Sequence, residues 1–318
     1  MKTEIIVFGQ TGTFIPAVCG AVSFSTDMRG CGVLKFSALK EGKLDFKEGN
    51  CVIARCDGKM FFKGWVFEKN RDKTGIINTV CYDQLRYFKN KDCLTYTAKT
   101  ASDVLKMLAA DNMLKTGEID ETGYIIPYRI EDNATLFDMI FTALDITRQN
   151  TGRDYVLYDD CGSLCLKNST ELMRDYYVCA QNCIDINYTS SVDRDTYNSI
   201  KLVHSDARKG IYNVYSARNS ASEARFGKLQ YYSHIPEEVN GAYLANELLR
   251  QHNRVGRLLK VKAMGDMSLR AGCIVRVDLD LGDFTLESFM QCSHVNHSIS
   301  DKEHIMQLTL KGGEFVYE

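Results

Sequence analysis

The chain has 318 residues, with 39 Lys and Arg against 41 Asp and Glu. This length is enough for two or three domains that each bury a core, and the balanced charge argues against binding along a nucleic-acid backbone or an anionic membrane surface. No apolar run reaches the length of a membrane helix, and the start "MKTEIIVFGQ" has no apolar segment of signal-peptide length.

Residues 1–95 are predicted to form a first domain made of short strands. The segments "NCVIAR", "MFFKGWVFE" and "IINTVCYD" are rich in β-branched and aromatic residues, and "CDGK" and "NRDKTG" separate them. Asp-Gly and Thr-Gly turns between such segments are typical of antiparallel hairpins. A small β-barrel or sandwich is the expected product.

Residues 96–180 change to a helical period. Thr100 is positioned to cap a helix through "ASDVLKMLAADNML", with Asp103 in its first turn. A second helix is predicted after Asn133, with an apolar stripe made of Leu136, Met139, Ile140, Ala143, Leu144 and Thr147. The segment "YVLYDDCGSLCLKN" then favours a hairpin, so this region is predicted to be an α+β domain.

Residues 181–318 are predicted to form a second β-domain. Strand-like segments such as "TYNSIKLVHSD", "GCIVRVDLDL" and "HIMQLTLKG" surround one helix in "EEVNGAYLANELLRQHNR", where Val239, Tyr243, Leu244 and Leu248 share one side. The predicted fold class is therefore mainly β with an α+β insertion, in which two antiparallel β-barrel domains flank a middle α+β domain.

An internal repeat is predicted between residues 48–80 and 270–309. Each has a Gly followed by a Cys-led apolar strand, an aromatic-containing strand, an Asp-Lys turn and an Ile-led strand. The spacing is the same from Val66, Asp72, Lys73 and Ile76 to Val295, Asp301, Lys302 and Ile305. The repeat indicates two copies of one β-domain. In this alignment His294 takes the place of Trp65.

The segment "HVNHSISDKEH" contains three of the six histidines, His294, His297 and His304. In a hairpin, one register pairs His294 with Met306 and sends His297 to the other face, whereas another pairs His297 with His304 and turns His294 away. Either register lets only two of the three meet. Because His294 aligns with Trp65, the favoured interpretation is one packed histidine and two near a turn, and no metal site is predicted.

No catalytic or cofactor-binding residues are predicted. The sequence has no G-x-G-x-x-G after a strand, no Walker loop and no G-x-S-x-G. Its twelve cysteines include no C-x-x-C, so they are expected to be reduced thiols that fill apolar space.

Several motifs, taken in order, resemble one known family. They are "FFKGWV", "YDQLRYFKNKD" followed by "TASDVLKMLA", "TGRDYVLYDDCGSLCL", "TYNSIKLV", "FGKLQ", "GDMSLRAGCIVRV" and "HVNHS". Together they cover most of the chain and resemble the baseplate hub proteins of contractile phage tails, in the version found in PBSX-like prophages and phage-tail-like bacteriocins. The residues that carry the resemblance are Phe62, Gly64, Val66, Tyr82, Asp83, Leu85, Tyr87, Asn198, Gly227, Gly265, Asp266, Arg270, Gly272 and His294.

The resemblance implies two tube-like β-barrels per chain, so that a homotrimer presents six similar barrels around a channel. Such a ring joins a hexameric tail tube to a trimeric spike, and duplication of the barrel satisfies both symmetries. Strands from after the middle domain complete the first barrel in some family members, so residues 181–215 are expected to belong with either barrel.

The predicted function is therefore a non-enzymatic structural hub without cofactors. Its expected partners are its own copies, the tail tube protein, the central spike protein and other baseplate proteins, with no specific nucleic-acid recognition and no membrane insertion. The expected location is a virion or a DNA-free tailocin particle, assembled in the bacterial cytoplasm. The main alternative is a cell-wall-degrading hydrolase of the same injection machinery, metal-dependent through His294, and a carbohydrate-binding β-module is a third.

Overall fold

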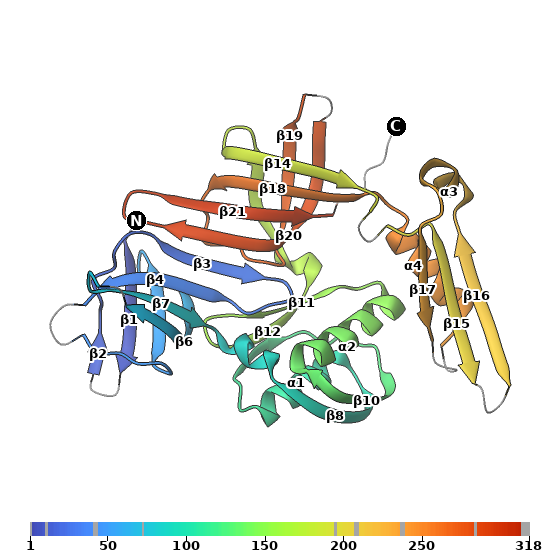
Figure 1. Cartoon of the computed structure of the whole chain (residues 1–318), viewed down its shortest axis with the longest axis horizontal. Helices are drawn as coiled ribbons and strands as arrows, with labels where there is room; N and C mark the ends of the chain where they lie inside the picture. Colours follow the sequence, from blue (N-terminus) through green and yellow to red (C-terminus); the bar gives the residue numbers. More distant parts are fainter. Residues whose placement is uncertain are drawn as a thin grey trace. The chain divides into compact units, whose positions relative to one another are not determined.

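The computed structural model describes residues 2–9, 12–40, 44–71, 73–193, 196–206, 210–235, 239–282 and 285–312. It is mainly β, as predicted (Figure 1). Two compact units are present, one formed by residues 1–187 and 259–318 and the other by residues 188–258. The predicted domain bounds at residues 95 and 180 stay a prediction.

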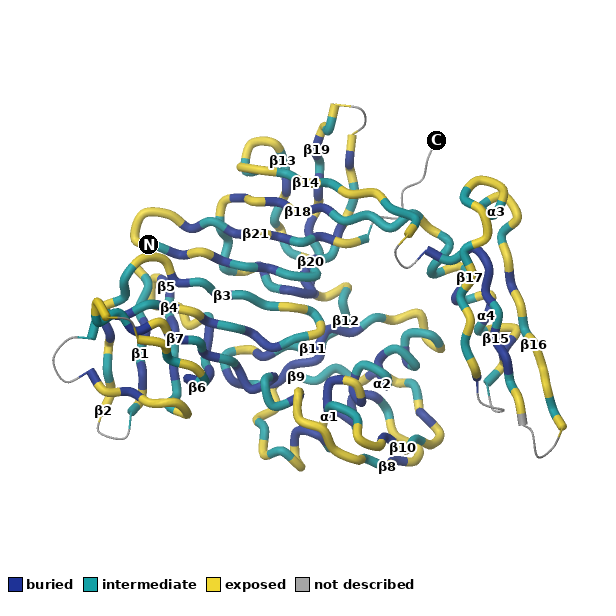
Figure 2. The backbone as a smooth tube through the Cα atoms, in the orientation of Figure 1, coloured by how far each residue is buried: buried dark blue, intermediate teal, exposed yellow. Residues whose placement is uncertain are grey.

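The N-terminal strands of the first unit form one side of a large sheet. They are β1 (Thr3–Gly9), β2 (Gly12–Phe14), β3 (Val22–Asp27), β4 (Val33–Leu39), β5 (Cys51–Cys56), β6 (Lys59–Arg71) and β7 (Ile76–Tyr82). Inward side chains alternate along these strands, as expected when one face of a sheet is buried. The resulting core includes Val7, Phe24, Leu34, Val52 and Phe62 (Figure 2).

The C-terminal strands continue the same sheet. They are β13 (Met173–Cys179), β14 (Cys183–Ser191), β18 (Gly256–Met264), β19 (Ile274–Asp280), β20 (Thr285–Ile299) and β21 (His304–Lys311). Strand β20 pairs with β3, from His294 opposite Asp27 to Ile299 opposite Val22. Thirteen strands thus join in one sheet among the described residues.

The two halves of this sheet repeat one strand order. The first half runs β3-β4-β7-β6-β5 and the second runs β14-β18-β21-β20-β19. We call these two halves repeat 1 and repeat 2. No closed barrel forms among the described strands, because the edge of β3 that a barrel would close on is taken by β20. The core of repeat 1 nevertheless collects inward side chains from β1 through β7, so its sheet wraps around one interior.

Main-chain hydrogen bonds fix how the repeats align. In repeat 1, Gly49 N–H donates to Val66 O and Val66 N–H donates to Asn50 O. In repeat 2, Gly272 N–H donates to Cys292 O and Cys292 N–H donates to Cys273 O. Val66 therefore corresponds to Cys292. The ladders with β7 and β21 are each interrupted directly after these two residues, by a bulge in β6 and a bulge in β20.

This alignment corrects the one drawn from the sequence. Trp65 lies opposite Tyr82 and Gln291 lies opposite Lys311, so Gln291 takes the place of Trp65 and His294 takes the place of Glu68. Beyond the hairpin the predicted alignment holds, because Lys40 N–H donates to Gly75 O as Gly265 N–H donates to His304 O. The β20–β21 hairpin is longer than the β6–β7 hairpin. Two residues at the same distance in sequence from the two turns therefore need not be equivalent in the sheet. Asp72 lies outside the described residues.

The middle region forms the predicted α+β layer. It contains the 3-10 helix η1 (Gln84–Lys89), β8 (Lys91–Lys99), α1 (Ala101–Asp111), β9 (Thr116–Ile119), β10 (Ile126–Thr135), α2 (Leu136–Thr151), β11 (Tyr155–Asp159), β12 (Leu164–Asn168) and the 3-10 helix η2 (Ser169–Leu172). Thr100 caps α1 in a capping box with Asp103, as predicted. All six stripe residues of α2 are buried.

The second unit is a small α/β module. It contains β15 (Ser199–Asp206), β16 (Ile211–Arg218), α3 (Ser220–Phe226), β17 (Gln230–His234) and α4 (Gly241–His252). Strand β15 pairs antiparallel with β16 and parallel with β17. Leu248 of α4 packs on Ile200 and Leu202, whereas Tyr243 is 53% exposed, so the predicted apolar stripe of this helix is wrong at Tyr243.

Candidate functional site

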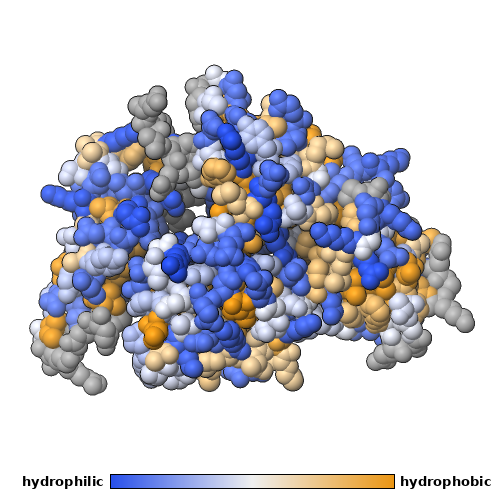
Figure 3. Space-filling view, turned by 180° about the vertical axis from the view of Figure 1, so that it is seen from behind, coloured by the Kyte–Doolittle hydropathy of each residue, from blue (hydrophilic) through white to orange (hydrophobic). Residues whose placement is uncertain are grey.

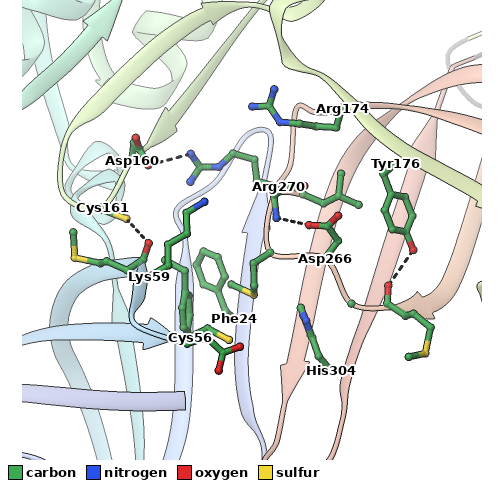
Figure 4. A pocket seen from close by; sticks show the side chains of 18 of the residues that line it. Phe24, Cys56, Lys59, Asp160, Cys161, Arg174, Tyr176, Asp266, Arg270 and His304 are labelled. Atoms are coloured by element: carbon green, nitrogen blue, oxygen red, sulfur yellow. Dashed lines mark hydrogen bonds and ion pairs between the residues drawn. The ribbon is translucent and has the colours of Figure 1, made fainter. Parts of the chain in front are cut away.

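The loop between β18 and β19, residues 265–272, lies in the first unit and carries four motif residues. We call it the junction loop. It lines a cleft of about 840 Å³ together with residues of β5, β6, β13 and the β11–β12 turn (Figure 4). Gly265, Asp266 and Arg270 all line this cleft.

Arg270 ties the junction loop to the middle region. Its Nη2 donates to the carbonyl oxygen of Asp159 at 2.7 Å, and its guanidinium lies 4.2 Å from the centre of the Tyr158 ring. Asp160 Oδ1 is 3.9 Å from Nη1 (Figure 4), but the Asp160 side chain is exposed, so this ion pair adds little stability. Planar stacking and a fixed fork of donors suit arginine rather than lysine here.

Both glycines of the junction loop stand where a side chain has no room. A Cβ on Gly265 would lie 2.1 Å from the His304 ring, and a Cβ on Gly272 would lie 2.3 Å from Val156 Cγ1. Gly272 also has a φ of +92°, a left-handed conformation that favours glycine. Ala271 N–H donates to Thr26 Oγ1 at 2.9 Å, which connects the same loop to β3.

Two buried histidines hold the loop from its inner side. His297 Nε2 is 2.9 Å from Leu269 O, and His297 Nδ1 is 2.9 Å from His304 Nε2. Because a carbonyl oxygen only accepts, His297 carries its proton on Nε2 and accepts from His304 through Nδ1. Burial lowers the pKa of His297 to about 4 and lowers the pKa of His304 as well, so both rings are neutral near pH 7.

His294 lies apart from this pair. Its Nδ1 is 3.3 Å from Asp27 Oδ2, on the exposed side of the β20–β3 pairing, and this hydrogen bond helps to lower the pKa of Asp27. The expectation that only two of the three histidines meet is confirmed. The assignment is reversed, however: His297 and His304 are packed and His294 is half exposed, because the bulge in β20 shifts the ladder to pair His297 with Met306.

A second buried polar group joins repeat 1 to the middle region. The Asp83 carboxylate accepts from Gly32 N–H at 2.7 Å and from Leu85 N–H at 3.0 Å. Burial and then the nearby Asp159 raise the pKa of Asp83 well above its ordinary value, and burial raises the pKa of Asp159 to about 6. Both acids cap turns, since Asp159 Oδ1 accepts from Gly162 N–H at 2.6 Å.

The remaining motif residues are structural in their contacts. Phe62 and Leu85 are buried in two different cores, and a Cβ on Gly64 would lie 2.2 Å from Tyr82 O. Tyr82 and Tyr87 both contact the Phe67 ring.

Asn198 and Gly227 belong to the second unit. The Asn198 side chain donates to Gly227 O at 2.7 Å and accepts from Leu229 N–H at 2.8 Å. Asn198 is fully buried, so these bonds fix the loop after α3.

Two thiols that line the cleft are not activated. Burial raises the pKa of Cys161 to about 11 and also raises the pKa of Cys56, so these thiols stay protonated near pH 7. Within the described part of the chain, no three His, Cys, Asp or Glu side chains gather as a metal site would require. No described helix is long and apolar enough to cross a membrane.

Sequence reasoning found the residues of the junction loop but missed Asp159, His297 and Thr26 as its anchors. Only their hydrogen bonds to a distant segment identify all three, and such bonds leave no local sequence signal.

A family profile described as YQBQ-like matches residues 22–311. The chain belongs to the YQBQ-like family. Two Bacillus subtilis proteins align with it over 239 residues, covering 73% of this chain and 72% of their own length: the uncharacterized protein YqbQ at 30% identity and the phage-like element PBSX protein XkdQ at 29%. The resemblance to tail baseplate proteins of PBSX-like prophages, drawn from the motifs, is thereby confirmed.

This YQBQ-like chain also shares its fold with a solved tail protein. The 43 kDa tail protein of prophage MuSo2 from Shewanella oneidensis superposes with a TM-score of 0.71 at 12% identity, covering 96% of this chain and 98% of that one. At that identity the likeness concerns the fold.

Proposed function

We propose that this protein is the structural hub of a contractile-tail baseplate, a homotrimeric ring that joins the hexameric tail tube to the trimeric spike. The observation that carries this proposal is the repeated strand order within one chain, β3-β4-β7-β6-β5 and β14-β18-β21-β20-β19. Three copies of a chain with two such repeats supply six similar surfaces, which matches a six-fold tube to a three-fold spike. Membership in a family with a PBSX relative supports the assignment to a tail.

The proposed role is non-enzymatic, in surfaces rather than in a reaction centre. The junction loop supports it, because its glycines have no space for a side chain and its arginine bonds to a carbonyl, and both features hold the repeats and the middle region together. The face shown in Figure 3 is mostly hydrophilic with scattered apolar patches, as expected for a protein whose contacts are distributed.

The proposed partners are the tail tube protein, the spike protein and other baseplate proteins, and the proposed location is a virion or tailocin particle assembled in the bacterial cytoplasm. Cryo-electron microscopy of tails from a producing strain tests this. We expect a three-fold ring with six similar repeats between tube and spike. A chain found elsewhere in the particle, or present there as single copies, would contradict the proposal.

A further inference from the structure

The edge of repeat 1 and the edge of repeat 2 differ in one respect. In repeat 1, β3 pairs with β4 on one side and with residues 294–299 of β20 on the other. Those residues of β20 extend past the part of the strand that pairs with β19, which ends at Gln291. One strand thus serves two neighbours on the same side, β19 along its first half and β3 along its second (Figure 1).

The counterpart of the second half of β20 is residues 68–71 of β6. These residues pair with β7, from Glu68 opposite Val80 to Arg71 opposite Ile77, and they lie beyond the pairing with β5, which ends at Trp65. On their other side no strand pairs with them among the described residues. We call residues 68–71 the β6 notch.

The counterpart of β3 is β14. It pairs with β18 and ends the sheet, so its outer side has no strand partner in the described part of the chain. Its side chains are half exposed or exposed throughout, with Ile184 53% exposed. An unpaired strand edge presents a row of main-chain donors and acceptors that another strand is able to satisfy.

We propose that β14 of one copy pairs antiparallel with the β6 notch of the next copy, as β3 pairs with β20 inside each chain. Each chain then offers one β14 edge and one β6 notch, a head-to-tail arrangement that closes into a ring. This inference rests on the proposed function for its number of copies, and it names the surface by which the copies meet.

Space agrees with this pairing. In the internal junction His294 of β20 faces Asp27 of β3 on the exposed side. Its counterpart in the β6 notch is Glu68, so this ion pair is not repeated there, and Lys69 and Arg71 take the places of the buried Val295 and His297. The loop before β5 comes close to the notch, since the Lys69 side chain donates to Phe46 O. In repeat 2 the junction loop takes the place of this loop and lies beside β20. Ala271 of the junction loop donates to Thr26 of β3, so the loop leaves room for β3.

One residue of the notch has an identical counterpart, which supplies a matched control. Asn70 corresponds to Asn296, and Asn296 lies opposite Ser25 in the β20–β3 pairing and accepts a hydrogen bond from Ser23 Oγ at 2.9 Å. A photo-crosslinking benzoylphenylalanine at Asn296 is expected to react with β3 of its own chain. The same residue at Asn70 is expected to react with residues 183–191 of another chain.

The test uses the full-length chain, alone at high concentration and in particles isolated from producing cells. Irradiated protein is separated by mass, and the crosslinked peptides are mapped by mass spectrometry. Two-chain and three-chain adducts from position 70 that map to residues 183–191 support the proposal. Trimers whose adducts map elsewhere, or that give none while the Asn296 control reacts, overturn this surface and leave the trimer intact. Particles without any oligomer of this chain overturn both proposals.

Discussion

Repeat 1 and repeat 2 place different residues at equivalent positions after the bulge. Repeat 2 has Val295, His297 and Ile299, all buried against β3 and the junction loop. Repeat 1 has Lys69 and Arg71 at the first two of these places, half exposed and exposed. The same backbone therefore carries a finished internal junction in one repeat and an open, charged edge in the other. The difference teaches that the contact at repeat 2 is complete within one folded chain, whereas the edge of repeat 1 has no strand partner among the described residues.

The largest expected effect comes from filling the space beside His304. In Gly265→Val the new Cβ alone would lie 2.1 Å from the His304 imidazole. We therefore expect the free energy of unfolding to fall by about 3 kcal/mol or more. The matched variant in repeat 1 is Lys40→Val, at a position with a half-exposed side chain, which should cost less than about 1 kcal/mol. Urea denaturation measures both, and equal losses would contradict the alignment of the repeats.

The next effect concerns pH on the acidic side. The pKa of His297 is lowered to about 4 in the folded protein, against an ordinary value of 6.5. The unfolded chain then binds more protons between these values, so stability present above pH 6.5 is lost as the pH falls toward 4, by at most roughly 3 kcal/mol.

His297→Gln should flatten that slope in a series of urea melts between pH 7 and pH 4. Arg71→Gln, the equivalent change in repeat 1, should leave the slope unchanged. A wild-type slope that persists in His297→Gln would show that other groups cause it.

Asp159 is expected to act with the opposite sign. Its folded pKa of about 6 lies above its ordinary value of 3.8, so the folded state holds an extra proton in this window and stability falls as the pH rises from about 4 to 6. Asp159→Asn keeps an acceptor for Gly162 N–H and should stabilise the protein at pH 7. The measurement is the thermal midpoint at pH 7 and at pH 4, where the gain should vanish.

Arg270→Lys is expected to lose the bond to Asp159 O and the stacking on Tyr158, at a cost of about 1–2 kcal/mol. Hydrogen exchange should increase in β11 and the junction loop while that of β1 and β5 stays unchanged. A uniform increase across the large sheet would mean that Arg270 stabilises the whole unit rather than this junction.

The smallest effect is expected at His294. Its contact with Asp27 is half exposed, so His294→Ala should change stability by less than about 0.5 kcal/mol. Glu68→Ala is the equivalent change in repeat 1 and should be equally mild. A large loss for His294 alone would restore the interpretation of this residue as a packing position.

Local patterns in the sequence predicted the elements of the fold well. The cap of α1, the apolar stripe of α2, the hairpin of β11 and β12, and the existence of a repeat all follow from periods and turn residues within a few positions of one another. The small unit of residues 188–258 was not foreseen, because its strands have the same composition as those of the large sheet.

The alignment of the repeats and the roles of the histidines could not be read locally. A bulge adds a residue to one strand and not to its partner, which reverses the side on which every later residue lies. Trp65 and His294 therefore share a spacing to the next turn without sharing a place in the sheet, and the anchors of Arg270 come from a segment more than a hundred positions away.

The pairing of β3 with β20 has a consequence for how the chain is made. Strand β3 leaves the ribosome long before its partner, residues 294–299. Until those residues are made, β3 is an uncovered strand beside a formed core, a state open to pairing with the wrong chain. Neighbouring chains on one message would be at risk of joining through β3, the very edge that the finished protein seals. Polar residues alternate with the buried Val22 and Phe24 along "VSFSTD", so the face of β3 turned away from the core is hydrophilic.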